Sequence, residues 1–362
     1  MKPITTLNMK RLNRLLVMLL AVTACQDGYI DDIQPRSAGP DESAPEVTLT
    51  YPATPVVLIP FTDQSTDINF EFEVRDDIEI TEIALVLNGN TLTTIDEFKD
   101  YRRVVASHRS ASLDVGNYTV EVIAKDASGK STTKRFDFEI SNVYQAKYPG
   151  EVLYMPFEGD VFLDLLENRE ASRVGTPGFA AGKSGRAYAG ATNAYLTLPA
   201  SVIGSNEFSV SFWYKVNAVP DRAGMLTVSP PGPTNNNRTS GFRLFREAAG
   251  AKQRIKLNVG NGTADTWFDG GAAADIDADA DWVHIAFTVA NDRCAVYING
   301  NVVSQGTFLG ISWADCEVLS IGSGAPNFTE WNHLSDLSLI DELRIFDRAL
   351  TAEQVTTIFE DN

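Results

Sequence analysis

The sequence has few of the side chains on which most enzymes depend. Its 362 residues include only three histidines and three cysteines. The histidines (His108, His284 and His333) are scattered, which leaves little general-base capacity. There is no Cys-x-x-Cys pair, no His-Glu-x-x-His motif, no Gly-x-Ser-x-Gly motif and no phosphate-binding loop. The sequence therefore gives no support for a zinc site, a serine nucleophile or a nucleotide site, and it predicts a protein that is not an enzyme.

Positive charge is also scarce. The chain has 30 basic and 48 acidic residues, for a formal net charge of −18 at pH 7. Such a surface repels phosphate backbones, so nucleic acid is not expected as a partner. Neutral sugars, cations and basic proteins are compatible with it, and so is a simple role in solubility.

The longest apolar run near the N-terminus is too short to cross a membrane. Leu15–Val22 is an eight-residue apolar stretch after a basic segment, whereas a membrane-spanning helix needs about 20 apolar residues. This pattern predicts a signal peptide over residues 1–24. Val22-Thr23-Ala24-Cys25 resembles the lipobox of bacterial lipoproteins. The resemblance implies cleavage before Cys25 and acylation of that residue, with an ordinary secretory signal as the alternative.

The residues after Cys25 predict how the protein is displayed. An acidic stretch at 26–32 resembles the signals that export some lipoproteins to the outer face of the outer membrane. Residues 33–45 are rich in proline, serine and glycine, so 25–45 is expected to be a lipidated cysteine followed by a flexible tether. We therefore expect an outer-membrane protein that faces the exterior and touches the membrane through its lipid anchor only.

Two cysteines remain beyond Cys25. Cys294 and Cys316 each open a strand-like run, and thiols outside the cytoplasm can pair. The sequence predicts either a Cys294–Cys316 disulfide or two buried free thiols, because it does not show whether the two Cα atoms lie within about 7 Å.

Residues 46–142 alternate between apolar and polar side chains over short runs, as in Ile68, Phe70, Phe72 and Val74. Period-two patterning with turn signals such as Asn88-Gly89 predicts half-buried antiparallel strands. The run GNYTVEVIAKDASGKSTTKRFDFEI (116–140) resembles bacterial Ig-like repeats. That resemblance implies an Ig-like β-sandwich that acts as a spacer.

Residues 150–362 also show alternating strands and one helix signal. Phe208, Val210, Phe212 and Tyr214 are typical of a strand with one buried face. Thr351-Ala352-Glu353-Gln354 is a capping box that predicts a short C-terminal helix. Many strands without intervening helices predict a β-sandwich, so the whole chain is expected to be all-β.

Five segments of this second part resemble laminin-G-like, concanavalin-type jelly rolls, and they occur in the order of that family. They are LYMPFEGD (153–160), GKSGRAYAGATNAYLTLP (182–199), EFSVSFWYKV (207–216), DWVHIAFTVANDRCAVYINGNVV (281–303) and LIDELRIFDRALTAEQV (339–355). The sequence departs from the family at Glu158, where Asp is usual, and at Leu339, where Gly is usual. The Glu-x-Asp-x-x-Glu run of the family's glycanases is absent.

The resemblance also implies a metal site. The family often holds a structural Ca²⁺ near its opening turn and the Asp of its Ile-Asp-Glu segment. Carried onto this sequence, Glu158 and Asp341 become the candidate ligands, with backbone carbonyls completing the shell. Asp341 is two residues before Leu343 and four before Ile345, so the alternation along a strand predicts it on the same, core-facing side. A charge in that position must be paired or bound to a metal. The alternative is an Asp bonded to backbone amides or to an arginine.

Sugar binding needs aromatic rings beside hydrogen-bonding groups, because sugar C–H faces stack on rings while hydroxyls need polar partners. The loop candidates are Trp267 with Asp269, Trp313, and Trp331 with Asn332. The Pro/Asn-rich loop 229–241 is expected to be exposed, and such loops often carry function. The alternative for each tryptophan is a structural role, as a residue of the core or of its rim.

These observations predict a non-catalytic, cell-surface glycan-binding lipoprotein, in which the jelly roll is the carbohydrate-binding module and the Ig-like domain is a stalk. It resembles the accessory surface lipoproteins of starch-utilisation-type systems, so partner surface lipoproteins or a transporter are implied. One alternative is an adhesive or structural protein that binds other proteins. Another is an unusual glycan-cleaving hydrolase or lyase, the lyase using a tyrosine with an arginine or lysine.

Overall fold

The computed structural model describes residues 39–361, which form two compact units. The first contains the described residues up to Val57 together with Asp67–Glu139, and the second contains Leu58–Thr66 and the chain from Ile140. The predicted signal peptide, Cys25 and residues 25–38 of the tether lie outside the described residues. Between residues 39 and 361, no helix combines the length and apolarity needed to cross a bilayer.

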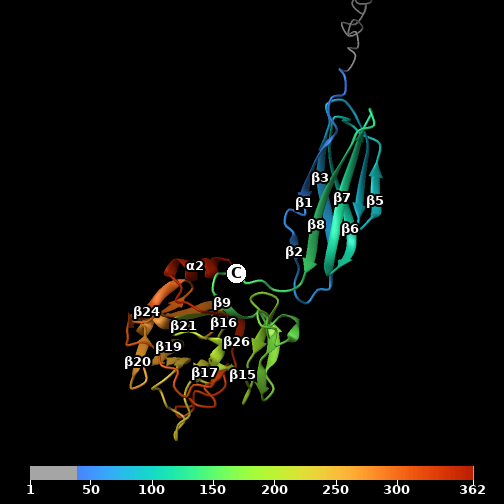
Figure 1. The fold of residues 1–362 in the computed structure, drawn as a ribbon. Coiled ribbons are helices and arrows are strands. Elements are labelled where there is room, and N and C mark those ends of the chain that lie inside the picture. The colour runs from blue at the N-terminus through green and yellow to red at the C-terminus, as the bar shows by residue number, and fades with distance from the viewer. Residues whose placement is uncertain (1–38, 362) are drawn as a thin grey trace, which may run out of the picture. The chain divides into compact units, whose positions relative to one another are not determined.

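The first unit is built from two sheets (Figure 1). One sheet has the order β2-β8-β7-β4-β5 and the other has the order β1-β3-β6. The strands are β1 (Glu46–Tyr51), β2 (Val56–Leu58), β3 (Ser65–Arg75), β4 (Ile80–Leu87), β5 (Asn90–Ile95), β6 (Arg103–Asp114), β7 (Gly116–Asp126) and β8 (Ser131–Ser141). The side chains at 68, 70, 72 and 74 of β3 are buried, as their alternation predicts.

The C-terminal end of the predicted tether is packed against this first unit. Lys130 Nζ donates hydrogen bonds to the carbonyl and to the carboxylate of Asp41, the latter at 2.8 Å. Ser43 Oγ donates to Asp77 Oδ1 at 2.8 Å. Residues 41–43 are therefore anchored to the first unit. The sequence had predicted a flexible tether as far as residue 45.

The second unit is a sandwich of two eight-stranded sheets. We call the sheet β12-β15-β25-β17-β18-β19-β20, with β21 beside β19, the front sheet. The back sheet is β13-β14-β26-β16-β22-β23-β24, with β9 beside β26. A two-stranded sheet of β10 and β11 and a C-terminal helix, α2, complete the unit. Residues 39–361 are therefore all-β with one short α-helix at the C-terminal end, as predicted.

The elements of this unit have the following bounds. The strands are β9 (Glu151–Met155), β10 (Leu163–Asp164), β11 (Arg169–Glu170), β12 (Ser172–Val174), β13 (Gly178–Ala181), β14 (Arg186–Ala189), β15 (Tyr195–Pro199), β16 (Phe208–Lys215), β17 (Arg222–Val228), β18 (Phe242–Ala249), β19 (Lys252–Gly260), β20 (Asp265–Asp269), β21 (Asp275–Asp277), β22 (Val283–Val289), β23 (Arg293–Ile298), β24 (Asn301–Thr307), β25 (Val318–Ile321) and β26 (Leu339–Phe346). The helices are the 3₁₀ turns η1 (Glu158–Asp160), η2 (Ala200–Val202) and η3 (Gly271–Ala274), and α2 (Ala352–Glu360).

The core lies between the two sheets because alternate residues of each strand face it. Phe212 of β16, Leu244 of β18, Leu257 of β19 and Ile285 of β22 belong to one continuous buried cluster. Full burial of each such side chain stabilises the fold by roughly 1.5–3 kcal/mol. The alternation that brings these residues inward places their neighbours in sequence on the outer faces.

Helix α2 covers part of the outer face of the back sheet. Its capping box is formed as predicted, with Gln354 N donating to Thr351 Oγ1 at 3.2 Å and Thr351 N donating to Gln354 Oε1 at 2.9 Å. Val355 and Ile358 pack in a second cluster with side chains of β22, β23 and β26. The helix thus has an apolar face that the sheet buries.

A β-bulge in β26 corrects the predicted orientation of Asp341. Across from β16, Ser211 pairs with Arg344 and Trp213 pairs with Asp341, so β26 has one extra residue in this interval. Glu342 has a φ of 53°, in the left-handed region. The extra residue reverses the alternation of side chains between the two faces of the strand. Asp341 therefore lies on the outer face with Trp213 and not on the core face with Leu343.

The two cysteines of the second unit do not form the predicted disulfide. Both thiols are free. Cys294 is fully buried in the core on β23, and Cys316 lies in the loop before β25, where its amide donates to Trp313 O. Of the alternative, two buried free thiols, the structure shows both thiols free, with Cys294 buried and Cys316 half-buried.

Candidate functional site

Two of the predicted tryptophans meet on the front sheet. Trp267 lies on β20 and Trp331 on the loop between β25 and β26. Their ring centroids are 6.1 Å apart and their planes differ by 26°. Trp267 is 41% exposed, because its neighbour Phe268 faces the core and turns Trp267 outward. The pair therefore presents indole surface to solvent.

Arg238 lies over both indoles. Its guanidinium carbon is 4.7 Å from the ring centroid of Trp331 and 5.8 Å from that of Trp267, within the range of a cation–π contact. Nε donates to Asp265 Oδ2 at 2.9 Å and Nη1 donates to Asn236 Oδ1 at 2.8 Å. We call Trp267, Trp331 and Arg238 the tryptophan platform.

Buried aromatic rings support the tryptophan platform from the sheet. Phe245 is 1% exposed and meets Trp267 edge to face, with centroids 5.8 Å apart. Phe328 stacks on His333 at 4.8 Å and 7°, and it meets Trp331 edge to face at 6.0 Å. Packing of this kind restricts the orientation of the two indoles before any ligand arrives.

A buried arginine holds the loop that carries Arg238. Arg243 of β18 is fully buried, and it donates to Ser229 Oγ, to the carbonyls of Asn237, Arg238 and Ser240, and to Asn258 Oδ1. All these acceptors are neutral, and burial lowers the pKa of Arg243 to about 9. The side chain of Arg243 thus bonds to several carbonyls of loop 229–241, which was predicted to be exposed, and ties the loop to the sheet.

This loop is also bonded to the loop of Trp331. Asn236 and Phe328 form an antiparallel bridge, and Thr329 N donates to Asn235 O at 2.9 Å. Asn327 Nδ2 donates to Ser229 O at 2.8 Å. The tryptophan platform is therefore assembled from β20 and two mutually bonded loops.

Charged side chains on neighbouring strands border the aromatic cluster. Lys256 Nζ lies 3.0 Å from Glu247 Oε2 and 3.3 Å from Asp269 Oδ2, and His333 Nε2 lies 3.0 Å from Glu247 Oε1. The His333 bond, followed by Lys256, lowers the pKa of Glu247 to about 2. Glu247 is therefore ionised at neutral pH, and it pairs with Lys256, so this border offers hydrogen bonds without a large net charge.

The structure thus brings together Trp267, Asp269 and Trp331 of the predicted ligand residues, and it exposes Asn332 beside Trp331. Trp313 lies elsewhere, where its ring packs against Phe208 and Phe242. Sequence reasoning missed Arg238 and Arg243. The only signal for them was the unusual composition of loop 229–241.

The two predicted metal ligands face the same loop, 182–186. Asp341 Oδ2 accepts hydrogen bonds from the amides of Lys183 and Ser184, and Oδ1 accepts from Glu342 N. Glu158 Oε1 accepts from Arg186 N. Burial raises the pKa of Asp341 to about 7, and the groups that donate to its carboxylate are neutral backbone amides.

These contacts supply only part of a calcium site. Two carboxylates fit Ca²⁺, which takes six to eight oxygens, but the hydrogen-bond partners of Asp341 are backbone amide donors. Within residues 39–361, no group of three or more His, Cys, Asp or Glu side chains is placed to hold a metal. The remaining oxygens would have to come from carbonyls and water, so calcium stays a prediction.

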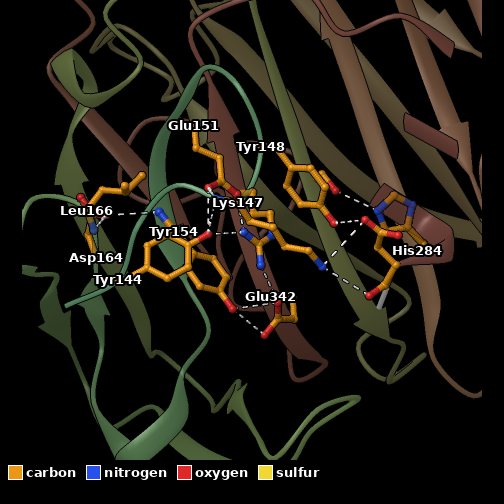
Figure 2. Close-up of polar contacts among 12 residues, drawn as sticks. Tyr144, Lys147, Tyr148, Glu151, Tyr154, Asp164, Leu166, His284 and Glu342 are labelled. Atoms are coloured by element: carbon orange, nitrogen blue, oxygen red, sulfur yellow. Dashed lines mark hydrogen bonds and ion pairs between the residues drawn. The ribbon is translucent and has the colours of Figure 1, made fainter. Parts of the chain in front are cut away.

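A second charged cluster lies on the outer face of the back sheet (Figure 2). Arg344 of β26 is 2% exposed and pairs with Glu151 and with Glu342 Oε2, the latter at 2.8 Å. Its guanidinium carbon lies 3.7 Å from the ring centroid of Tyr154, whose hydroxyl donates to Glu342 at 2.9 Å. Tyr144 bridges Arg344 and Glu151.

This cluster contains two carboxylates, an arginine and tyrosines, the residue types that a hydrolase or lyase would use. However, Glu151 and Glu342 are 8% and 7% exposed and share one arginine. Burial raises the pKa of Tyr144 to about 12, which keeps its hydroxyl protonated at neutral pH. In this arrangement one arginine compensates both carboxylates, and the Tyr144 hydroxyl keeps its proton at neutral pH.

The second unit is thus a two-sheet β-sandwich that presents a stacked indole pair, of which Trp267 is exposed and Trp331 is half-buried. Residues 190–356 match the family described as the concanavalin A-like lectin/glucanases superfamily, of the laminin-G type. This part of the chain is a concanavalin A-like jelly-roll domain. A search of curated proteins found no match.

Three solved structures illustrate the similarity to known domains. Domain 4 of an extracellular arabinanase from Geobacillus stearothermophilus, in complex with arabinotriose, is 26% identical over 58% of this chain and 98% of its own, with a TM-score of 0.46. The binding domain of Paraclostridial Mosquitocidal Protein 1 is 16% identical over 59% of this chain and 52% of its own (TM-score 0.43). The botulinum neurotoxin serotype C1 binding domain is 14% identical over the same shares, also at 0.43.

Proposed function

We propose that the protein is a non-catalytic glycan-binding lipoprotein of the cell surface, and that the tryptophan platform is its carbohydrate site. The observation that carries the proposal is the stacked pair of the exposed Trp267 and the half-buried Trp331, held by buried rings beneath. Sugar rings stack their C–H faces on indoles, and the paired polar groups alongside offer partners for hydroxyls. The family of residues 190–356 includes lectins in its description, which agrees with this role.

The platform is suited to uncharged sugars. Arg238 is paired with Asp265, and Lys256 with Glu247 and Asp269, so the local charges are largely compensated. The chain as a whole carries a formal charge of −18, which disfavours polyanionic glycans. A neutral polysaccharide or glycoconjugate glycan is therefore the proposed ligand.

The experiment is a glycan-array screen of a soluble fragment, residues 39–362, with analysis of each bound glycan for shortened products. The fragment begins at 39 because Asp41 and Ser43 contact the first unit. Binding to one class of neutral polysaccharide without product release is the expected result. No binding to any glycan contradicts the proposal and favours an adhesive role, and product release shows that the protein is an enzyme.

The lipid anchor belongs to the same proposal and rests on the Val22–Cys25 motif alone. The expected mature protein begins at Cys25, carries acyl chains and fractionates with the outer membrane. Its Cys25→Ala variant should remain unprocessed at this site and lose the acyl mass. Intact mass spectrometry of both proteins tests the prediction, and an unacylated wild type contradicts it.

A further inference from the structure

The surface of the second unit has a hollow of about 330 Å³ at the position of Trp313. Two segments form it, one after β15 and one before β25. The lining residues are Ala200, Ser201, Gly204, Ser205, Asn206, Trp313 and Cys316. Its volume is at the lower end of small-molecule pockets, which is suited to a ligand of one ring.

The aromatic residue that lines the hollow, Trp313, is well supported by the core. The Trp313 ring lies 5.4 Å from Phe208 and 6.3 Å from Phe242, centroid to centroid. Both phenylalanines are fully buried in the core, so the indole has little room to turn. A fixed aromatic face is the surface on which the C–H face of a sugar stacks.

The rim is polar and its hydrogen-bonding capacity is largely unused. Ser201 and Asn206 are exposed, and their side chains make no hydrogen bond to another residue in the described chain. Ser205 Oγ accepts from Glu207 N at 3.1 Å, which leaves its own O–H available. Hydroxyls and an amide of this kind match the hydroxyl groups of a sugar.

None of the lining side chains carries a charge at neutral pH. Burial raises the pKa of the Cys316 thiol to about 11, so it stays protonated. The lining of the hollow therefore combines an aromatic ring, a neutral thiol and polar groups. A charged ligand would find no counter-ion among the lining residues.

We propose that this hollow is a second binding site, which accepts one ring of a neutral sugar. It does not depend on the tryptophan platform, because Trp313 packs against Phe208 and Phe242 and makes no ring contact with Trp267 or Trp331 within residues 39–361. The protein would then hold glycan at two separate places on one domain.

Cys316 provides a direct reporter for occupancy. It is half-buried in the hollow, whereas Cys294 is fully buried and burial raises its pKa. In the fragment 39–362, labelling by a maleimide at pH 8 is followed at both thiols by mass spectrometry. The probes are glucose, galactose, mannose, xylose and arabinose, with glucuronic acid as the charged comparison.

At least one neutral sugar should slow the labelling of Cys316 by fivefold or more, and glucuronic acid should not. The Asn206→Ala and Ser201→Ala variants change exposed residues and should need about tenfold more sugar for the same protection. The Trp267→Ala/Trp331→Ala double variant should keep full protection, which separates this site from the platform. Protection lost in that double variant contradicts two separate sites.

A second measurement does not depend on the reactivity of the thiol. The indole N–H of Trp313 is assigned by NMR through its absence from the Trp313→Phe variant, and the same sugars are titrated. A saturable shift of that signal, weakened in Asn206→Ala, is expected. The proposal is wrong if none of the neutral sugars alters either the labelling or the N–H signal. It is also wrong if the Asn206→Ala variant responds to the sugars at the same concentrations as the wild type.

Discussion

Arg243 Nη1 donates a hydrogen bond to Asn258 Oδ1 across 3.1 Å, and this buried contact leads directly to the tryptophan platform. Asn258 Nδ2 donates in turn to Asp265 Oδ2 at 2.7 Å. The same carboxylate oxygen accepts from Arg238 Nε at 2.9 Å. A continuous chain of hydrogen bonds thus connects a fully buried arginine to the arginine that contacts both indoles.

We therefore expect Arg243→Lys to loosen loop 229–241. A lysine keeps the charge but lacks the forked donors that reach several carbonyls at once, so buried acceptors lose partners, which costs about 1–3 kcal/mol. Urea unfolding should show that loss, and the affinity for the glycan identified on the array should fall. The matched control is Arg293→Lys on the exposed side of β23, which should change stability by less than about 0.5 kcal/mol.

Arg344 compensates two buried carboxylates, so its removal should be costly. Arg344→Met leaves Glu151 and Glu342 without their cation, and breaking a buried pair in this way costs about 3–5 kcal/mol. The control is Lys252→Met, whose partner Asp277 is 64% exposed and whose loss should cost less than about 1 kcal/mol. Equal midpoints of urea unfolding for the two variants would contradict the structural role of the cluster.

His284 predicts a specific pH dependence of stability. It is 1% exposed beside Trp213 and bonded to Ser211 Oγ at 2.8 Å, and burial lowers its pKa to about 4. In the unfolded chain its pKa is about 6.5. Between these values the unfolded state binds the proton and the folded state does not, so stability falls as the pH is lowered from about 6.5 to 4.

The contribution of one such group is about 1.4 kcal/mol per pH unit at most. Free energies of unfolding from pH 4 to 7 are compared between the wild type and His284→Gln, which cannot titrate. The wild type should lose more stability than the variant over this interval. Parallel curves for the two proteins would show that His284 does not titrate as its burial predicts.

Calcium binding is tested at Asp341 and Glu158. With 1 mM calcium the melting temperature of the fragment 39–362 should exceed its value in EDTA, because a ligand that binds only the folded state stabilises it. The increase should disappear in Asp341→Asn and shrink in Glu158→Gln. The calcium site is contradicted if elemental analysis finds no calcium and the melting temperatures are equal. The hydrogen bonds from the amides of loop 182–186 would then be the only interactions that stabilise the Asp341 carboxylate.

Much of the fold follows from local sequence patterns. The alternation of Phe208, Val210, Phe212 and Tyr214 was sufficient to place β16 with that face in the core. The Asn299-Gly300 pair forms the turn between β23 and β24 with φ angles of 48° and 76°, as hairpin turns of this composition require. These features depend on neighbours in sequence, which is why they could be predicted.

The candidate site could be predicted only in part. Trp267, Asp269 and Trp331 were recognisable as residue types, but their meeting depends on the bridge between Asn236 and Phe328, which has no local signal. The orientation of Asp341 was predicted wrongly because the bulge at Glu342 shifts the register by one residue. Long-range pairing and a single irregular residue decide both outcomes, and neither appears in the periodicity of the sequence.

The central claim is that the indole pair binds glycan, and calorimetric titration of the array-selected polysaccharide tests it most directly. Wild type, Trp267→Ala, Trp331→Ala and the double variant are compared with Trp282→Ala, a half-buried tryptophan outside the platform. We expect at least a tenfold loss of affinity for each platform variant, about 1.4 kcal/mol, and none for Trp282→Ala, with folding checked by circular dichroism. Unchanged affinity in the folded double variant would contradict the account.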